Sequence, residues 1–159
     1  MTQDIDKIAL LQNYFTNNDI LLCNESKDTP SLGTVGGDWN SIVFLIEQGE
    51  VFYSKHYKNR VTYLSREYYS KIKPKNQHID KLSQKSQEVL EYIKAAGLAS
   101  TKDIKAALLL TEKEYNTSMN QLLKELLITA IKRDRIISDT WCTFYWGTTE
   151  RWESRIDYI

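Results

Sequence analysis

Three short helical segments and two strand-like runs follow one another closely between residues 84 and 147, and this order constrains the fold more than any other feature. Apolar residues recur at intervals of three and four in 84–96, 102–108 and 112–127, which predicts amphipathic helices. Only residues 109–111 separate the second helix from the third, so these two helices must turn sharply against each other. Residues 128–138 predict a strand that reaches a charged turn and begins to return, and 140–147 predict a second strand.

This order of three helices and a two-stranded hairpin is typical of a winged helix-turn-helix domain. The ends of the helices fit the same interpretation. Ser83 precedes the first helix and Gly97 follows it, and Thr111 with Glu114 has the spacing of a capping box at the start of the third. We therefore predict an α+β protein whose residues 82–159 form a winged helix-turn-helix domain.

The N-terminal half predicts a smaller lobe of helices and a hairpin. Periodic apolar residues indicate a helix over 4–17, and a short buried strand follows at 20–23. Asp38 is placed to cap a helix that ends at Gly49. Two runs, 51–57 and 61–64, predict a hairpin, and a short helix then ends before Pro74. We assign residues 1–75 to this lobe and 76–81 to a polar linker.

If the C-terminal half is a winged helix, its third helix is the recognition element that enters the major groove of DNA. Asn and Gln can hydrogen-bond to base edges and Lys neutralises phosphates, whereas the basic turn of the wing would follow the DNA backbone. The alternatives are an ordinary solvated helix face and an ordinary polar hairpin turn. The candidate nucleic-acid-binding residues are Lys113, Asn116, Thr117, Asn120, Gln121 and Lys124 on the helix, and Lys132, Arg133 and Arg135 on the wing.

The net charge of zero hides an uneven distribution of charge along the chain. Residues 1–50 hold two basic and eight acidic side chains, whereas 51–81 hold eight basic and two acidic ones. The basic segment could join the wing in one positive surface, or the two segments could pack together and cancel. Both arrangements remain open from the sequence.

Composition excludes several other classes of protein. No apolar run approaches the ~18 residues of a membrane span, and the start of the chain lacks the basic region of a secretory signal. Cys23 and Cys142 stand in apolar surroundings, and no CxxC or HxxxH spacing indicates a zinc site. We therefore expect a cytoplasmic protein with reduced thiols, without a metal or other cofactor and without a membrane partner.

An aromatic cluster, Trp141 to Trp146, occupies the last predicted strand. Side chains of a strand alternate between its two faces, so Trp141 and Tyr145 lie on one face and Phe144 and Trp146 on the other. Both faces are therefore apolar, which predicts that the strand is covered on both sides. Trp152, in a short helix that follows, is a candidate for one of the covers.

Several segments resemble a bacterial winged-helix group related to the AlkZ alkylpurine DNA glycosylases, whose members mostly have no assigned activity. The similar segments are VFYSKHYKNRVTYLSREYYSKI, KLSQKSQEVLEYIKAAGLASTKDIKAAL and WCTFYWGTTERWE, within residues 38–155. The resemblance implies a winged-helix architecture and a link to DNA. The glycosylases act through a Gln/His-x-Gln/Asp pair, and the tripeptide from His78 to Asp80 matches it. The chain is less than half the length of those tandem-domain enzymes, so we assign no catalytic residue.

These observations lead to one functional hypothesis and two alternatives. We expect a DNA-binding or DNA-associated protein whose partner is double-stranded DNA. A protein-protein interaction module, with another chain or a second copy as its partner, is the first alternative. A small DNA-glycosylase-like enzyme is the second.

Overall fold

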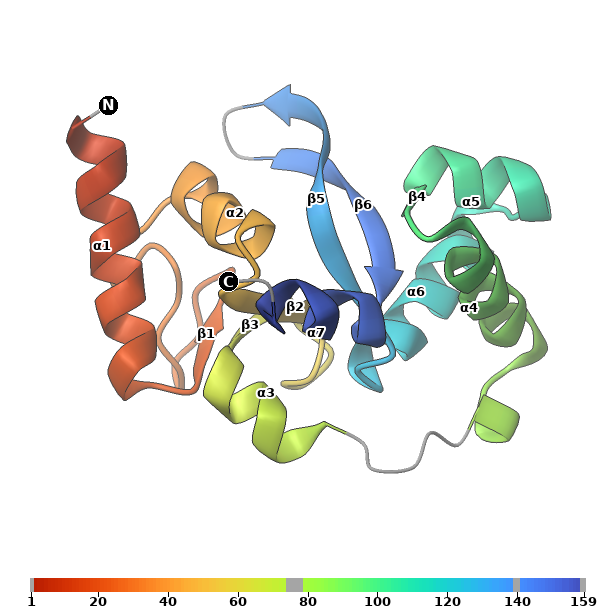
Figure 1. Cartoon of the computed structure of the whole chain (residues 1–159), viewed down its shortest axis with the longest axis horizontal. Helices are drawn as coiled ribbons and strands as arrows, with labels where there is room; N and C mark the ends of the chain where they lie inside the picture. The colour runs from red at the N-terminus through yellow and green to blue at the C-terminus, as the bar shows by residue number, and fades with distance from the viewer. Residues whose placement is uncertain (1, 74–78, 139–140, 158–159) are drawn as a thin grey trace.

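A computed structural model describes residues 2–73, 79–138 and 141–157, and the chain has the mixed α+β architecture that the sequence predicts (Figure 1). The N-terminal half contains α1 (Thr2–Asn17), β1 (Ile20–Leu22), α2 (Trp39–Glu47), β2 (Val51–Ser54), β3 (Thr62–Ser65) and α3 (Arg66–Ile72). A 3-10 turn (Ile79–Lys81) leads to α4 (Gln84–Ala96), β4 (Ala99–Ser100), α5 (Thr101–Leu108), α6 (Glu112–Lys124), β5 (Ile128–Ser138), β6 (Trp141–Thr148) and α7 (Thr149–Asp157).

The predicted caps hold the helix ends. Asp38 Oδ1 accepts a hydrogen bond from the Ser41 N–H (2.9 Å) at the start of α2. At α6 the Thr111 hydroxyl accepts from the Glu114 N–H (3.1 Å), and the Glu114 carboxylate accepts from the Thr111 N–H (2.9 Å). These contacts satisfy N–H groups that have no partner inside a helix. Gly97 ends α4 with a φ of 80°, a conformation that glycine adopts without steric cost.

Two antiparallel sheets of three strands form the framework. Their strand orders are β1-β3-β2 in the N-terminal half and β4-β6-β5 in the C-terminal half. The predicted β2–β3 hairpin is confirmed, and Asn59 has a positive φ in the connection, as does Lys58. Strand β4 has only two residues, which is too short to leave a periodic signal in the sequence. It joins the C-terminal sheet because Ala99 and Ser100 pair with Trp146 and Tyr145.

The prediction of a turn at Lys132–Arg135 is wrong. Strand β5 continues through these residues to Ser138, and the connection to β6 comes later, at residues outside the described part of the chain. The pairing of β5 with β6 shifts register three times, between Ala130 and Lys132, between Arg133 and Arg135 and between Ile136 and Ser138. Such bulges bend and twist a strand without ending it. They therefore allow a charged run to remain inside a long hairpin.

The β5–β6 hairpin lies in the middle of the molecule, with α2 on one side and α4 and α5 on the other (Figure 1). Phe144 and Trp146 of β6 are buried, in agreement with the expected cover on that face. Trp152 of α7 is fully buried, but the rings that it meets belong to the N-terminal half. Phe52 and Tyr69 each lie 5.0 Å from it between ring centroids.

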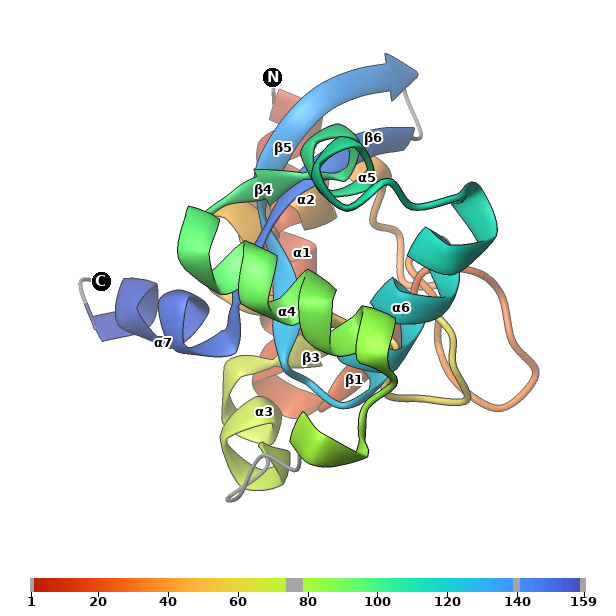
Figure 2. The same ribbon diagram turned by 90° about the vertical axis from the view of Figure 1, so that its right-hand side faces the viewer.

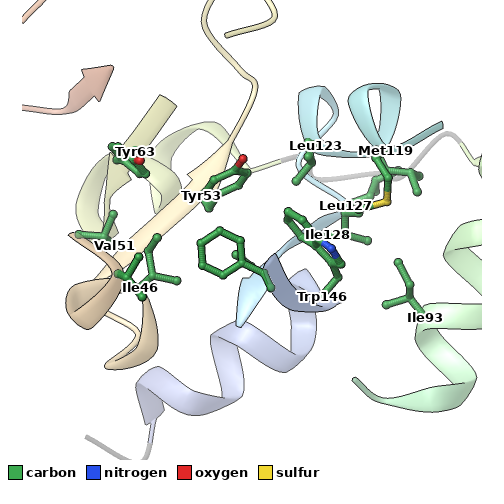
Figure 3. Close-up of a cluster of buried hydrophobic side chains, with 14 of the residues drawn as sticks. Ile46, Val51, Tyr53, Tyr63, Ile93, Met119, Leu123, Leu127, Ile128 and Trp146 are labelled. Atoms are coloured by element: carbon green, nitrogen blue, oxygen red, sulfur yellow. The ribbon is translucent and has the colours of Figure 1, made fainter. Parts of the chain in front are cut away.

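Side chains from both sides of the predicted linker form a single hydrophobic cluster. In Figure 3, Tyr53 and Tyr63 come from the N-terminal sheet, and Leu123, Ile128 and Trp146 approach them from the C-terminal half. The ring of Tyr53 lies 5.5 Å from the rings of Phe144 and of Trp146. The N-terminal lobe therefore packs directly on the elements predicted to form the winged helix.

A buried side-chain hydroxyl links the two sheets. Strand β2 is at the edge of its sheet, and the Tyr53 N–H donates to Thr129 Oγ1 of β5 (3.1 Å). The same hydroxyl donates back to the Tyr53 carbonyl oxygen (2.8 Å). An edge strand presents unpaired backbone groups, and groups of this kind are costly when they are buried without a partner. Thr129 thus satisfies one donor and one acceptor at once, at the contact between the halves.

We predict that Thr129→Val lowers the free energy of unfolding by roughly 2–6 kcal/mol. Valine keeps the shape of threonine, but it removes the hydroxyl that pairs with the buried Tyr53 N–H and carbonyl, and losing a buried hydrogen-bond partner costs roughly 1–3 kcal/mol for each group. Chemical denaturation monitored by circular dichroism measures the change. Thr129→Ser is the matched control because it keeps the hydroxyl. A valine variant as stable as the serine variant would contradict this role.

Candidate nucleic-acid interface

The exposed face of α6 is a stripe of polar and basic side chains, the α6 stripe. Lys113, Thr117, Asn120 and Lys124 are all exposed and recur at steps of four, three and four residues, which places them on one side of the helix. The buried residues of α6, among them Tyr115, Met119 and Leu122, occupy the opposite side. The turn before α6 is tight because Leu109 ends α5 with a φ of 52°. Four of the six helix residues named from the sequence therefore lie together on one exposed face of α6.

The two remaining helix residues lie at the edges of this face. Gln121 is half-buried, and its side-chain oxygen accepts a hydrogen bond from the Ser83 N–H at the start of α4 (3.3 Å). Asn116 is exposed and lines a cavity between the two halves of the molecule. Neither residue is therefore part of the α6 stripe.

Two of the acidic residues on α6 pair with neighbouring helices. Glu114 accepts from the Lys85 ammonium of α4 (2.9 Å), and Glu112 pairs with Lys105 of α5. In the described part of the chain, neither Lys113 nor Lys124 has an acidic partner. Glu112 and Glu114 are thus engaged by Lys105 and Lys85 of the neighbouring helices, and Lys113 and Lys124 keep their positive charges on the stripe.

Lys55 is a contributor to this face that the candidate residues did not include. It follows β2, and its ammonium donates to Asn120 Oδ1 of α6 (2.6 Å). Its backbone N–H donates to the Leu123 carbonyl (3.3 Å), which fixes the 55–61 connection beside α6. Partial burial lowers the pKa of Lys55, because desolvation disfavours the charged form. The basic composition of 51–81 was the only signal for it in the sequence.

The three predicted wing residues lie on strand β5 and differ in their surroundings. Lys132 is exposed, and its ammonium lies 5.1 Å from the centre of the Tyr145 ring. Arg133 is half-buried, and its backbone N–H donates to the Glu47 carboxylate of α2 (3.1 Å). The side chain of Arg135 lies outside the described residues. In Figure 2, as in Figure 1, the far end of β5 stands at the top of the molecule, whereas α6 lies lower.

The basic segment 51–81 divides between two places. Lys55 lies beside α6, whereas Lys71 and Lys73 belong to the end of α3 and pair with Glu67 and Glu153. Lys58 pairs with Asp28, so one contact also joins the basic segment to the acidic N-terminal segment. The Lys58–Asp28 pair therefore realises in part the packing of the basic against the acidic segment, whereas Lys55 lies beside α6 and not beside the wing, so a positive surface shared with the wing stays a prediction.

The described residues offer little for other chemistry. Among them, no group of three or more His, Cys, Asp and Glu side chains is placed to hold a metal ion. Asp80 is exposed in the 3-10 turn, and His78, the other residue of the tripeptide, lies outside the described residues. Within the same ranges, no helix combines the length and the apolar character needed to cross a membrane.

Comparisons with protein families, with curated proteins and with solved structures gave no match for this chain. Functional inference therefore depends on the residues and their geometry.

We predict that the cap of α6 makes stability depend on pH through Glu114. The Thr111 N–H and the Lys85 ammonium lower the pKa of Glu114 to about 2, from a usual value of 4.5. Because the pKa of Glu114 is lower in the folded than in the unfolded state, ionised Glu114 stabilises the folded state at pH values above about 4.5. This contribution is lost as the pH falls from about 4.5 towards 2. In thermal melts, Glu114→Gln should be less stable than the parent at pH 7, and the difference should shrink to less than half by pH 3. A difference that is constant with pH would contradict this account.

Proposed function

We propose that this chain binds double-stranded DNA through the α6 stripe, with the β5–β6 hairpin along the neighbouring backbone. The observation that carries the proposal is the α6 stripe itself, with its two unpaired lysines. Lys113 and Lys124 are eleven residues apart, which is about 16 Å along a helix at 1.5 Å per residue. The major groove is roughly 12 Å wide, so lysines at this spacing can reach phosphates on both of its sides. Thr117 and Asn120 between them can then contact base edges.

The arrangement of elements supports a winged helix-turn-helix as the framework for this function. The order is α4, β4, α5, α6 and the β5–β6 hairpin, and β4 completes a sheet of order β4-β6-β5. In helix-turn-helix proteins the second helix of the motif enters the major groove, and here that helix is α6. The resemblance to the group related to the AlkZ glycosylases implies the same framework. We place the protein in the cytoplasm and assign it no reaction.

Lys55 supports the proposal from the N-terminal half. Its ammonium is partly desolvated, and it donates a hydrogen bond to the neutral amide of Asn120, at 2.6 Å. A phosphate near Asn120 would offset the cost of burying this charge, because an anion within a few ångströms favours the charged form. Binding of DNA would thus raise the pKa of Lys55 and couple the N-terminal lobe to the interface.

We predict that the double variant Lys113→Ala/Lys124→Ala weakens binding to duplex DNA and makes it less dependent on salt. Each phosphate contact contributes roughly −0.9 to the slope of log K against log salt concentration. Loss of two contacts should therefore flatten the slope by about two units. Fluorescence anisotropy of a labelled random duplex, measured from ~20 to 200 mM salt, gives both the affinity and the slope.

The matched control is Lys71→Ala/Lys94→Ala, which removes the same charge from exposed positions on α3 and α4. This control variant should keep most of the affinity for duplex DNA and nearly all of the slope of log K against log salt concentration. If both double variants weaken binding equally, the total positive charge of the protein attracts the DNA, and α6 has no special part in it. If the parent protein does not bind duplex even at ~20 mM salt, the proposal fails.

One observation favours the alternative of a protein partner or a homodimer. Ile5 and Leu10 of α1 are 66% and 41% exposed, and Phe44 of the neighbouring α2 is 41% exposed. Exposed apolar side chains that lie on adjacent helices often mark a surface that binds another protein. These residues and the α6 stripe lie on different elements, so failure to bind DNA would give this alternative first place.

A further inference from the structure

A cavity of about 540 Å³ lies between the two halves of the molecule, next to the first turns of α6. Its walls come from β2 and α2 on one side and from α5, α6 and β6 on the other. The volume is within the roughly 300–1,000 Å³ of typical small-molecule sites. The cavity exists because the N-terminal lobe packs against the C-terminal half.

Aromatic rings form much of the cavity wall. They are Trp39, Tyr53, Tyr115, Phe144 and Trp146. Neighbouring rings are steeply inclined, with interplanar angles of 53° between Trp39 and Phe144 and of 68° between Tyr53 and Trp146. Aromatic pairs favour offset stacking and edge-to-face contact, so inclined walls offer both faces and edges to a flat ring.

A hydrogen-bonded pair of hydroxyls adds a donor to this wall. The Thr101 and Tyr115 hydroxyl oxygens are 2.7 Å apart, and the Trp146 indole N–H donates to Thr101 Oγ1 (3.3 Å). Two hydroxyl hydrogens are present and only one lies between the two oxygens, so the other can donate to a ligand. Burial raises the pKa of Tyr115 to about 12, which keeps this hydroxyl protonated at neutral pH.

The charge of the cavity wall selects against a charged ligand. Lys105 and Glu112 are the charged residues among those that line the cavity, and they pair with each other. Asn116 supplies an amide, which offers both a donor and an acceptor. Aromatic walls, an available hydroxyl donor, an amide and balanced charge together fit one class of ligand.

We propose that this cavity binds a small, uncharged, planar heteroaromatic molecule. The ring packs against the aromatic walls, and a ring nitrogen accepts from the Thr101–Tyr115 hydroxyl pair. The inference does not depend on the proposed function, because it is tested on the protein without DNA. A failure of the small molecule to bind would therefore contradict this inference alone, and a failure of duplex DNA to bind would contradict only the proposed function.

The test uses benzimidazole and adenine as planar probes and cyclohexanol as a non-planar control. Isothermal titration calorimetry should give saturable binding of the planar probes, with dissociation constants below about 1 mM for molecules of this size. Cyclohexanol should bind at least tenfold more weakly. Saturating probe should also slow alkylation of Cys23, which lines the cavity and is partly exposed, as measured by peptide mass spectrometry.

Two substitutions on neighbouring helices locate the site. Asn116→Phe on α6 places a ring into the cavity and should weaken probe binding at least tenfold. Ala107→Phe on α5 adds the same ring at an exposed position that does not line the cavity, so the probe should bind as it does to the parent. The proposal is overturned if the probes do not bind, if cyclohexanol binds equally well, or if the two variants bind alike. Protection of Cys23 by an adenine-containing oligonucleotide but not by free adenine would also overturn it, in favour of a base that belongs to a strand.

Discussion

The contact between Thr129 and Tyr53 governs how the two halves of this molecule meet. A single hydroxyl accepts from the Tyr53 N–H and donates to the Tyr53 carbonyl, so the edge of one sheet is fixed against a strand of the other. Both hydrogen bonds are buried, and a buried backbone group is costly when it loses its partner. The Tyr53 ring then packs on Phe144 and Trp146, and Lys55, two residues further along, reaches α6. The contact thus lies where the halves meet, between the aromatic cavity that Tyr53 lines and the α6 residues that Lys55 reaches.

The same packing explains how a chain without net charge can present a positive surface. Glu112 and Glu114 pair with Lys105 and Lys85 at the edges of α6, so their charges are neutralised close to the helix. Surface ion pairs of this kind add little stability, but they decide which charges stay available to a partner. Lys113 and Lys124 stay available on the exposed face. The proposed DNA surface is thus produced by the pairing of acidic residues elsewhere and not by an excess of basic ones.

Local signals in the sequence were sufficient for the helices and the first hairpin. The capping box of Thr111 and Glu114 and the apolar period of α6 depend on residues close together in the chain, and both are confirmed. The extent of β5 was not predictable, because its bulges arise from pairing with β6 and its charged residues imitate a turn. Lys55 was missed as a site residue because its partner Asn120 is 65 positions away. The cavity likewise joins residues that only the packing of the two halves brings together.

The central claim is that the α6 stripe is the surface that meets DNA, and a titration followed by nuclear magnetic resonance tests it most directly. Backbone amide shifts of the isotope-labelled protein are recorded as a short duplex is added at low salt. The account predicts that the largest shifts map to α6 between Lys113 and Lys124, with smaller ones at Lys55 and Lys132. Shifts concentrated on α1, α2 or α3, with α6 unchanged, would contradict it.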